Sequence, residues 1–205
     1  SIIGVSNASK GAGATFLLLG RSKLAEETAS WIDWDDDQLN ARKMELRESL
    51  IAESETGKVT MVEWNNAWQK FTRSRDVYLT LDAIEQTGNH ATYHSVDVMD
   101  QSALQELGSS LGRPITGLVH GAGLEDSKLV ADKGYEVFDR VVRVKVDGWR
   151  ALLSAVVASG REVPEFACCF TSVAGRFGNG GQTDYAAANS AVSYTHLTLP
   201  TNREV

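Results

Sequence analysis

Four short runs that are expected to form strands, separated by stretches of helical periodicity, most constrain how this chain can fold. They lie at residues 14–19, 91–98, 115–119 and 165–171. The first runs straight through Phe16 to Leu19 without polar alternation, which is typical of a strand covered on both faces in a parallel sheet. Strands that alternate with helices predict an α/β fold built on a doubly wound parallel sheet.

Helix signals fill the segments between these runs. Asp100 is expected to cap a helix that Gly112 and Pro114 terminate. Residues 132–160 carry apolar side chains at helical spacing and predict one long helix. Lys145 lies in that helix, and the strand at residues 165–171 delivers Ser172 to the carboxyl edge of the sheet, where open α/β sheets bind ligands.

Residues 23–77 are too many for a single crossover and predict a helical insertion. The acidic cluster Trp31–Asp37 is interpreted as a solvated helix start rather than a metal site, because it lacks the glycine turns of oxygen-rich metal loops. Thr60 with Glu63 forms a capping box that opens a second helix. A later apolar stripe, residues 77–84, is assigned to a separate crossover helix.

The segment Phe170–Gly175 contains Ser172, and Tyr185 follows Ser172 by thirteen positions across a glycine-rich turn. Asn189 lies one helical turn beyond Tyr185, on the same face. A phenol at its ordinary pKa is a sluggish proton donor near neutral pH. A nearby ammonium favours the phenolate form, and Lys145 is the candidate for that ammonium.

This serine–tyrosine pair resembles the acid-catalysis pair of short-chain dehydrogenases/reductases. Most of that superfamily has lysine where this chain has Asn189, and the lysine is found upstream at Lys145. That exchange is similar to the ketoreductase domains of polyketide and multidomain fatty-acid synthases. The resemblance implies an incomplete Rossmann-type fold over residues 1–191, with the first and last strands missing.

The resemblance also implies roles for four catalytic residues. Ser172 would hold the substrate carbonyl, and Tyr185 would donate the proton as hydride arrives. Lys145 would act on the tyrosine and bond the cofactor ribose, while Asn189 would position Lys145 or a water of a proton relay. His120 is interpreted as a packing residue rather than an acid.

The expected cofactor is NADPH. Arg21 and Ser22 follow the first run at the place where a Rossmann fold meets the adenosine ribose, and arginine there suits a 2′-phosphate. By resemblance, Asp97-Val98 contacts adenine and Gly121–Gly123 lies beside the nicotinamide. The residues expected to bind the cofactor are Gly20, Arg21, Ser22, Asp97, Val98, Gly121, Ala122, Gly123, Lys145 and Tyr185.

The substrate implied by the resemblance is a 3-oxoacyl thioester on an acyl carrier protein, reduced to the 3-hydroxyacyl form. The partners would be that carrier and the other synthase domains of the same polypeptide, and the insertion resembles those of polyunsaturated fatty-acid synthases. Stereochemistry stays open, because residues 124–127 do not match the Leu-Asp-Asp pattern of one ketoreductase class. Two alternatives remain: a stand-alone dehydrogenase, and a degenerate domain that only scaffolds a synthase.

Both ends of the sequence are expected to be unnatural. Residues 1–8 resemble the middle of the family's first helix, so the first strand and its pyrophosphate loop are expected to be absent. Gly11-Ala12-Gly13 precedes a strand, whereas a pyrophosphate loop follows one. Residues 192–205 resemble a translated sequencing-library adapter. Without its first strand the sheet would keep two unpaired inner edges, so this chain is expected to fold poorly and be inactive.

Composition narrows the class of protein only broadly. A net charge of −7 argues against nucleic-acid binding and favours an ordinary soluble, cytoplasmic protein. No apolar run approaches the length of a membrane span. Cys168 and Cys169 are adjacent in a buried strand and point to opposite faces, which predicts reduced thiols rather than a disulfide or a metal site.

Overall fold

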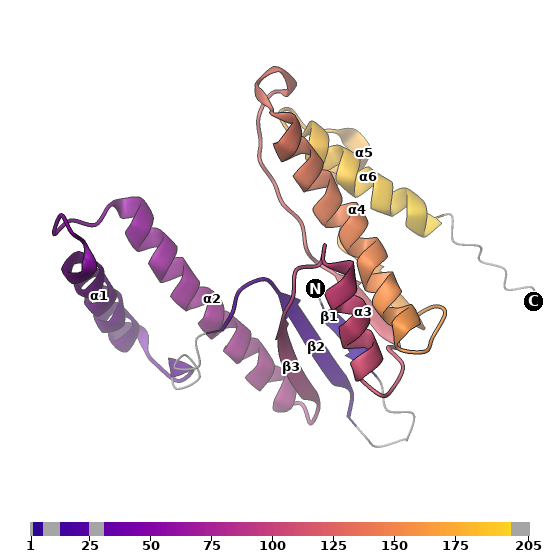
Figure 1. Cartoon of the computed structure of the whole chain (residues 1–205), viewed down its shortest axis with the longest axis horizontal. Helices are drawn as coiled ribbons and strands as arrows, with labels where there is room; N and C mark the ends of the chain where they lie inside the picture. The colour runs from indigo at the N-terminus through magenta and orange to yellow at the C-terminus, as the bar shows by residue number, and fades with distance from the viewer. Residues whose placement is uncertain (1, 6–12, 25–30, 198–205) are drawn as a thin grey trace, which may run out of the picture. The chain divides into compact units, whose positions relative to one another are not determined.

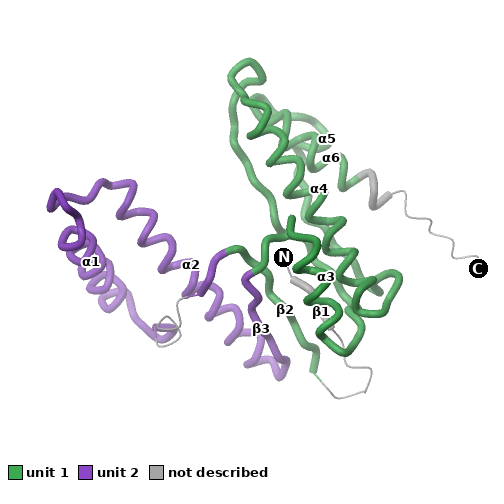
Figure 2. The backbone as a smooth tube through the Cα atoms, viewed as in Figure 1, with its two compact units in different colours: residues 1–21, 96–205 green, residues 22–95 purple. Residues whose placement is uncertain are grey.

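The structure of the chain, a computed structural model, describes residues 2–5, 13–24 and 31–197. The chain divides into two compact units, one formed by residues 1–21 and 96–205 and the other by residues 22–95 (Figure 2). We call them unit 1 and unit 2 and describe each by itself.

Unit 1 is an α/β unit in which helices cover a sheet (Figure 1). Its strands follow the order β2-β1-β4-β5. They are β1 (Ile2–Val5), β2 (Thr15–Gly20), β4 (Gly117–His120) and β5 (Phe166–Cys169). The helical elements are α3 (Gln101–Ser110), the 3-10 turn η2 (Val130–Asp132), α4 (Tyr135–Ala158), α5 (Ala174–Phe177) and α6 (Thr183–Leu197). The predicted α/β class is confirmed, and three of its predicted strands and its long helix lie within a few residues of their expected bounds.

The first strand of the sheet departs from expectation. Ile2–Val5 forms a strand between β2 and β4 rather than part of a helix, and it runs antiparallel to both neighbours. The unpaired backbone groups of the inner edges of β2 and β4 need partners. A short run rich in β-branched residues suits a strand position. The prediction of a helix here, and of two open inner edges, was therefore wrong.

The core of unit 1 lies between the sheet and helices α3, α4 and α6. Leu152 of α4 and Leu104 of α3 are completely buried there, together with Leu118 of β4. Full burial of such a side chain contributes about 1.5–3 kcal/mol. The helices α3 and α4 pack so closely that a Cβ on Gly108 would clash with the carbonyl oxygen of Ala155.

Unit 2 holds α1 (Asp36–Glu53), α2 (Met61–Glu85) and β3 (His90–Ser95). The predicted helix starts are confirmed: Asp35 caps α1 and forms a capping box with Gln38, and Thr60 does the same with Glu63. The second predicted helix and the separate crossover helix are one continuous helix, α2. No glycine or proline interrupts residues 61–85, so nothing breaks the helix at the expected boundary near residue 77.

Aromatic packing ties the start of unit 2 to α2. Trp31 stacks on Phe71 with ring centroids 4.5 Å apart, and Trp68 stacks on Phe71 as well, at 4.9 Å. The Arg75 guanidinium donates hydrogen bonds to the carbonyls of Trp31, Ile32 and Trp34 at 2.9–3.1 Å. Trp31 and Trp68 are therefore packing residues.

The last described residues continue α6 as far as Leu197. Val192 is 2% exposed and belongs to the core of unit 1. Residues 198–205 lie outside the described part of the chain, as do Gly11 and Ala12, so the adapter origin of residues 192–205 stays a prediction. None of the described helices is long and apolar enough to cross a membrane.

Candidate active site

The carboxyl ends of β4 and β5 bring two of the predicted site segments together. The two strands are parallel and in register from Gly117 opposite Phe166 to His120 opposite Cys169. Beyond the last pair, the amide of Phe170 donates a hydrogen bond to the carbonyl of His120 at 3.0 Å. The glycine segment after β4 and the serine segment after β5 therefore leave the sheet side by side.

Lys145 reaches this edge from the middle of α4. It is 5% exposed, and its Nζ donates a hydrogen bond to the carbonyl of Phe170 at 2.8 Å. Burial lowers the pKa of the Lys145 ammonium, while the electrostatic effect of Cys169 opposes that shift. A Cβ on Gly123 would lie 3.4 Å from this Nζ, so the glycine leaves room for the ammonium. A cation held by a neutral carbonyl beside the sheet edge remains able to attract a developing negative charge.

His120 supports the backbone of Lys145. Its ring is completely buried, and Nε2 lies 3.1 Å from the backbone carbonyl of Lys145, which fixes Nε2 as the donor. Burial and the positive charge of Lys145 lower the pKa of His120 to about 4. The ring also packs against Gly148 and Trp149. His120 is therefore a neutral packing residue, as predicted.

Ser172 lies in the turn that connects β5 to α5. It is half-buried, its Oγ accepts a hydrogen bond from the amide of Ala174 at 3.2 Å, and its carbonyl accepts one from Gly175 at 2.9 Å. A Cβ on Gly175 would lie only 2.9 Å from the Cβ of Asn189. Glycine at this position lets the serine turn approach the tyrosine helix.

Tyr185 occupies the first turn of α6, and Asn189 follows one turn later. The Nδ2 of Asn189 donates to the backbone carbonyl of Tyr185 at 2.7 Å. Asn189 is 1% exposed, and its Oδ1 has no hydrogen-bond partner among the residues that the structure describes. The expected contact between Asn189 and Lys145 is not formed: this Oδ1 is unpaired in the described ranges, and the Lys145 ammonium donates to the carbonyl of Phe170. The remaining prediction, that Asn189 orders a water of a proton relay, suits an unpaired buried acceptor.

Two charged residues of the site were not predicted. Lys133 and Asp184 form an ion pair at 2.5 Å, and their side chains are 2% and 0% exposed. Asp184 also accepts a hydrogen bond from the amide of Tyr185 at 2.8 Å. Asp184 directly precedes the tyrosine in the sequence, but no spacing rule connects it with Lys133.

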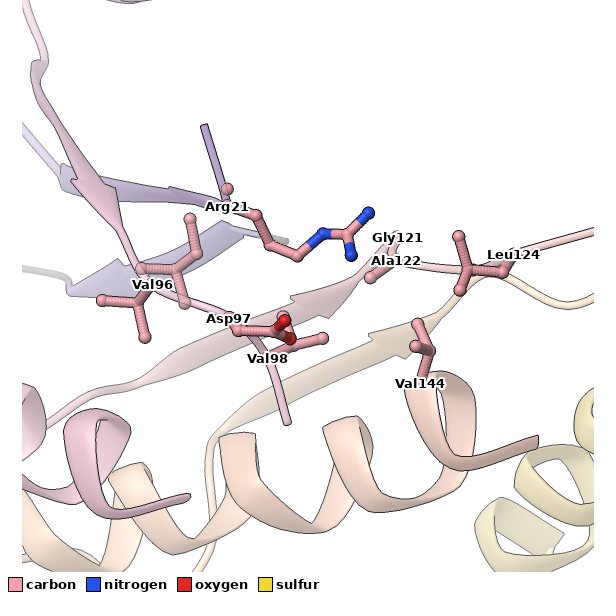
Figure 3. A pocket seen from close by; sticks show the side chains of 11 residues that line it. Arg21, Val96, Asp97, Val98, Gly121, Ala122, Leu124 and Val144 are labelled. Carbon is pink, nitrogen blue, oxygen red and sulfur yellow. The ribbon is translucent and has the colours of Figure 1, made fainter. Parts of the chain in front are cut away.

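A cavity of about 230 Å³ opens at the same sheet edge, between the end of β2 and the glycine segment after β4. Arg21 and Asp97 point into it (Figure 3). The amide of Val96 donates to the carbonyl of Gly20 at 2.9 Å and holds the two sides of the cavity together. The full lining is Leu19, Gly20, Arg21, Val96, Asp97, Val98, Gly121, Ala122, Gly123, Leu124 and Val144.

Seven of the ten predicted cofactor residues line this cavity: Gly20, Arg21, Asp97, Val98, Gly121, Ala122 and Gly123. Ser22 is not among the lining residues, and its carbonyl accepts a hydrogen bond from the Tyr93 hydroxyl. Neither Lys145 nor Tyr185 is part of the lining, although the Lys145 ammonium lies close to Gly123. An exposed guanidinium beside the glycine-rich backbone of residues 121–123 could hold part of a nicotinamide dinucleotide. The volume suits one end of a dinucleotide, since pockets for larger ligands measure roughly 300–1,000 Å³.

Comparison with known proteins gives a consistent result. The family model described as KR domain matches residues 8–195. A polyunsaturated fatty acid synthase from Thraustochytrium sp. is 33% identical in one of its chains over 194 residues, which cover 91% of this chain and 7% of that protein. An erythronolide synthase of Saccharopolyspora erythraea is 34% identical over 110 residues, or 54% of this chain and 3% of that protein. The chain thus spans a small fraction of the length of these relatives.

Solved structures agree with this similarity. A crystal structure of a ketoreductase domain from the bacillaene assembly line superposes with a TM-score of 0.56 at 25% identity, covering 89% of this chain and 33% of that one. The ketoreductase from the first module of phoslactomycin biosynthesis in Streptomyces sp. HK803 gives a TM-score of 0.50 at 30% identity, covering 55% of this chain and 26% of that one.

Proposed function

This chain belongs to the KR (ketoreductase) domain family, and we propose that its domain reduces a 3-oxoacyl thioester on an acyl carrier protein with NADPH. The family makes it part of an oxidoreductase that uses a nicotinamide cofactor. The observation that carries the finer proposal is the placement of Lys145, buried at the carboxyl edge beside the segment that bears Ser172.

We assign the proton to Tyr185 and the carbonyl contact to Ser172. When bound, NADPH supplies the hydride. Lys145 holds a positive charge near the sheet edge and favours loss of the tyrosine proton as the substrate oxygen becomes an alkoxide. The Ser172 hydroxyl, half-exposed at the same edge, donates to the substrate oxygen and orients it.

NADPH rather than NADH is favoured by Arg21. Its guanidinium points into the cavity at the end of β2, where a 2′-phosphate would find a charged, bidentate donor. Gly121–Gly123 leave backbone exposed on the other side of that cavity, so a cofactor can approach closely there.

We also propose that the 205-residue chain by itself does not reduce substrate. The pyrophosphate of a Rossmann cofactor binds at the carboxyl end of a central parallel strand. In unit 1 the central strand β1 is antiparallel, and its last residue, Val5, lies opposite Thr15 at the start of β2. The carboxyl end of β1 therefore lies at the edge of the sheet opposite Arg21.

The test is consumption of NADPH by the full-length protein from which the sequence comes, with a 3-oxoacyl thioester as substrate. Tyr185→Phe keeps the ring and removes the proton donor, so it should lower kcat by about 100-fold or more while NADPH still binds. No turnover by a correctly folded wild-type protein that binds NADPH would contradict the proposal and favour a scaffolding domain. Turnover of a free small alcohol or sugar, but not of the thioester, would favour a stand-alone dehydrogenase.

A further inference from the structure

The buried ion pair between Lys133 and Asp184 joins two loops that are distant in the sequence. The Lys133 ammonium has three protons, and it directs hydrogen bonds to three acceptors: the carbonyl of Asp126 at 2.7 Å, the carbonyl of Gly181 at 3.3 Å and Oδ1 of Asp184 at 2.5 Å. Asp126 lies after β4, and Gly181 and Asp184 precede Tyr185. One side chain thus holds the loop after β4 against the start of the tyrosine helix.

Further hydrogen bonds join the same two loops. The amide of Lys128 donates to the carbonyl of Gly181 at 2.9 Å. The side-chain amide of Gln182 donates to Glu125, and to Ser127 at 3.2 Å. The two loops are therefore joined directly before Tyr185 in the sequence. We call residues 125–133 together with residues 181–184 the clasp.

Asp184 connects the clasp to the tyrosine directly. Its Oδ1 accepts from both the Lys133 ammonium and the amide of Tyr185, whereas its Oδ2 has no hydrogen-bond partner within the described part of the chain. Apolar side chains of similar volume often stabilise a protein as well as a buried ion pair does. Stability is therefore a weak reason for burying this pair, and the converging bonds favour a role in geometry.

We propose that Lys133 and Asp184 are a positioning pair that fixes Tyr185 relative to Ser172 and Lys145. This inference rests on the proposed function, because it takes Tyr185 as the proton donor. The pair does not line the cavity that holds Arg21, so it acts on the proton-transfer geometry and leaves cofactor binding unchanged.

The experiment compares wild-type full-length protein with the double variant Lys133→Met/Asp184→Leu. The double variant replaces both charges together, so no unpaired charge remains buried and the fold is expected to persist. Its kcat should fall on the order of 100-fold, since small misplacements of reacting groups cost that much, while KM for NADPH stays unchanged. Arg143→Met, which breaks an exposed ion pair with Asp147 on α4, is the control and should leave kcat unchanged.

Hydrogen exchange of the peptide containing residues 181–187 gives a second readout that needs no turnover. The proposal expects faster exchange there in the folded double variant. A double variant that matches wild type in both kcat and exchange overturns the proposal. If wild-type protein does not reduce the thioester, the proposed function fails by itself, and hydrogen exchange then tests the positioning role. Faster exchange confined to the clasp supports that role, and unchanged exchange overturns it.

A conservative variant covers the case in which the double variant does not fold. Asp184→Asn keeps an acceptor for the amide of Tyr185 but removes the charge that holds Lys133. Because it leaves the Lys133 ammonium buried without a counter-ion, it should unfold at a lower urea concentration than wild type. Under native conditions, where it is folded, it should lower kcat and leave KM for NADPH unchanged. An unchanged kcat in Asp184→Asn overturns the proposal.

Discussion

Acid should unfold this protein in part through the imidazole of His120. The ring is 0% exposed, and burial together with the charge of Lys145 lowers its pKa from 6.5 to about 4. Between those two values the unfolded chain binds a proton at this ring and the folded chain does not, so acid favours the unfolded state. The stabilising contribution of the neutral ring is complete above pH 6.5 and is lost as the pH falls toward 4.

The size of the effect follows from the same two pKa values. Each pKa unit corresponds to about 1.4 kcal/mol, so lowering the pH from about 8 to about 5 should remove about 2 kcal/mol from the free energy of unfolding. At about pH 4 the loss should approach 3 kcal/mol. Losses of this size are a large fraction of the stability of an ordinary domain.

Urea unfolding of wild type and His120→Gln over this pH range checks the prediction. The glutamine amide can donate to the carbonyl of Lys145 as Nε2 does, but it does not titrate. The pH dependence of the unfolding free energy should therefore be smaller in the variant by about 2 kcal/mol between pH 8 and 5. Carboxylates titrate equally in both proteins and cancel in the difference. His90, whose side chain is 64% exposed, provides the matched control His90→Gln.

The reasoning is refuted if His120→Gln and wild type lose stability in parallel as the pH falls. That result would mean that the buried ring takes up its proton without opening the fold. A loss of pH dependence in His90→Gln instead would place the titrating group in unit 2.

Three further predictions concern the cofactor, the serine turn and the core. Arg21→Ala should raise KM for NADPH about 10-fold or more and leave KM for NADH unchanged, since a charge-assisted hydrogen bond contributes about 1.5–3 kcal/mol. Gly175→Ala should force α5 away from α6, because its Cβ would lie 2.9 Å from that of Asn189. We expect a loss of about 1–3 kcal/mol in urea unfolding and a lower kcat. Gly180→Ala, where an added Cβ meets nothing within 4 Å, is its control. Leu152→Ala should cost about 2–5 kcal/mol in the same assay, because the side chain is fully buried.

The sequence by itself determined the features that depend on neighbouring residues. Thr60 and Asp100 cap helices in the structure as predicted, because a cap needs only a side-chain acceptor and the amides two or three positions later. The cavity-lining residues after β2 and β4 were also predicted, since they follow strands whose carboxyl ends meet at one edge.

Which strand or side chain a residue pairs with could be determined only from the tertiary structure. Ile2–Val5 is too short for periodicity to separate strand from helix. It forms a strand because its backbone pairs with the inner edges of β2 and β4. Asn189 was placed on the correct face of its helix, but its partner is the carbonyl of Tyr185 rather than Lys145. Helix periodicity gives the direction of a side chain and leaves open which acceptor it meets.

The clasp is the clearest example of a feature that the sequence alone does not predict. Lys133 and Asp184 are 51 positions apart and carry no motif, so each taken singly has the sequence features of an ordinary surface charge. Only the return of the chain through α4 and β5 brings them together and buries them beside Tyr185. The sequence determined which local elements form and which residues stand at their ends. The tertiary structure decided which charges meet, because burial and pairing depend on segments that the sequence places far apart.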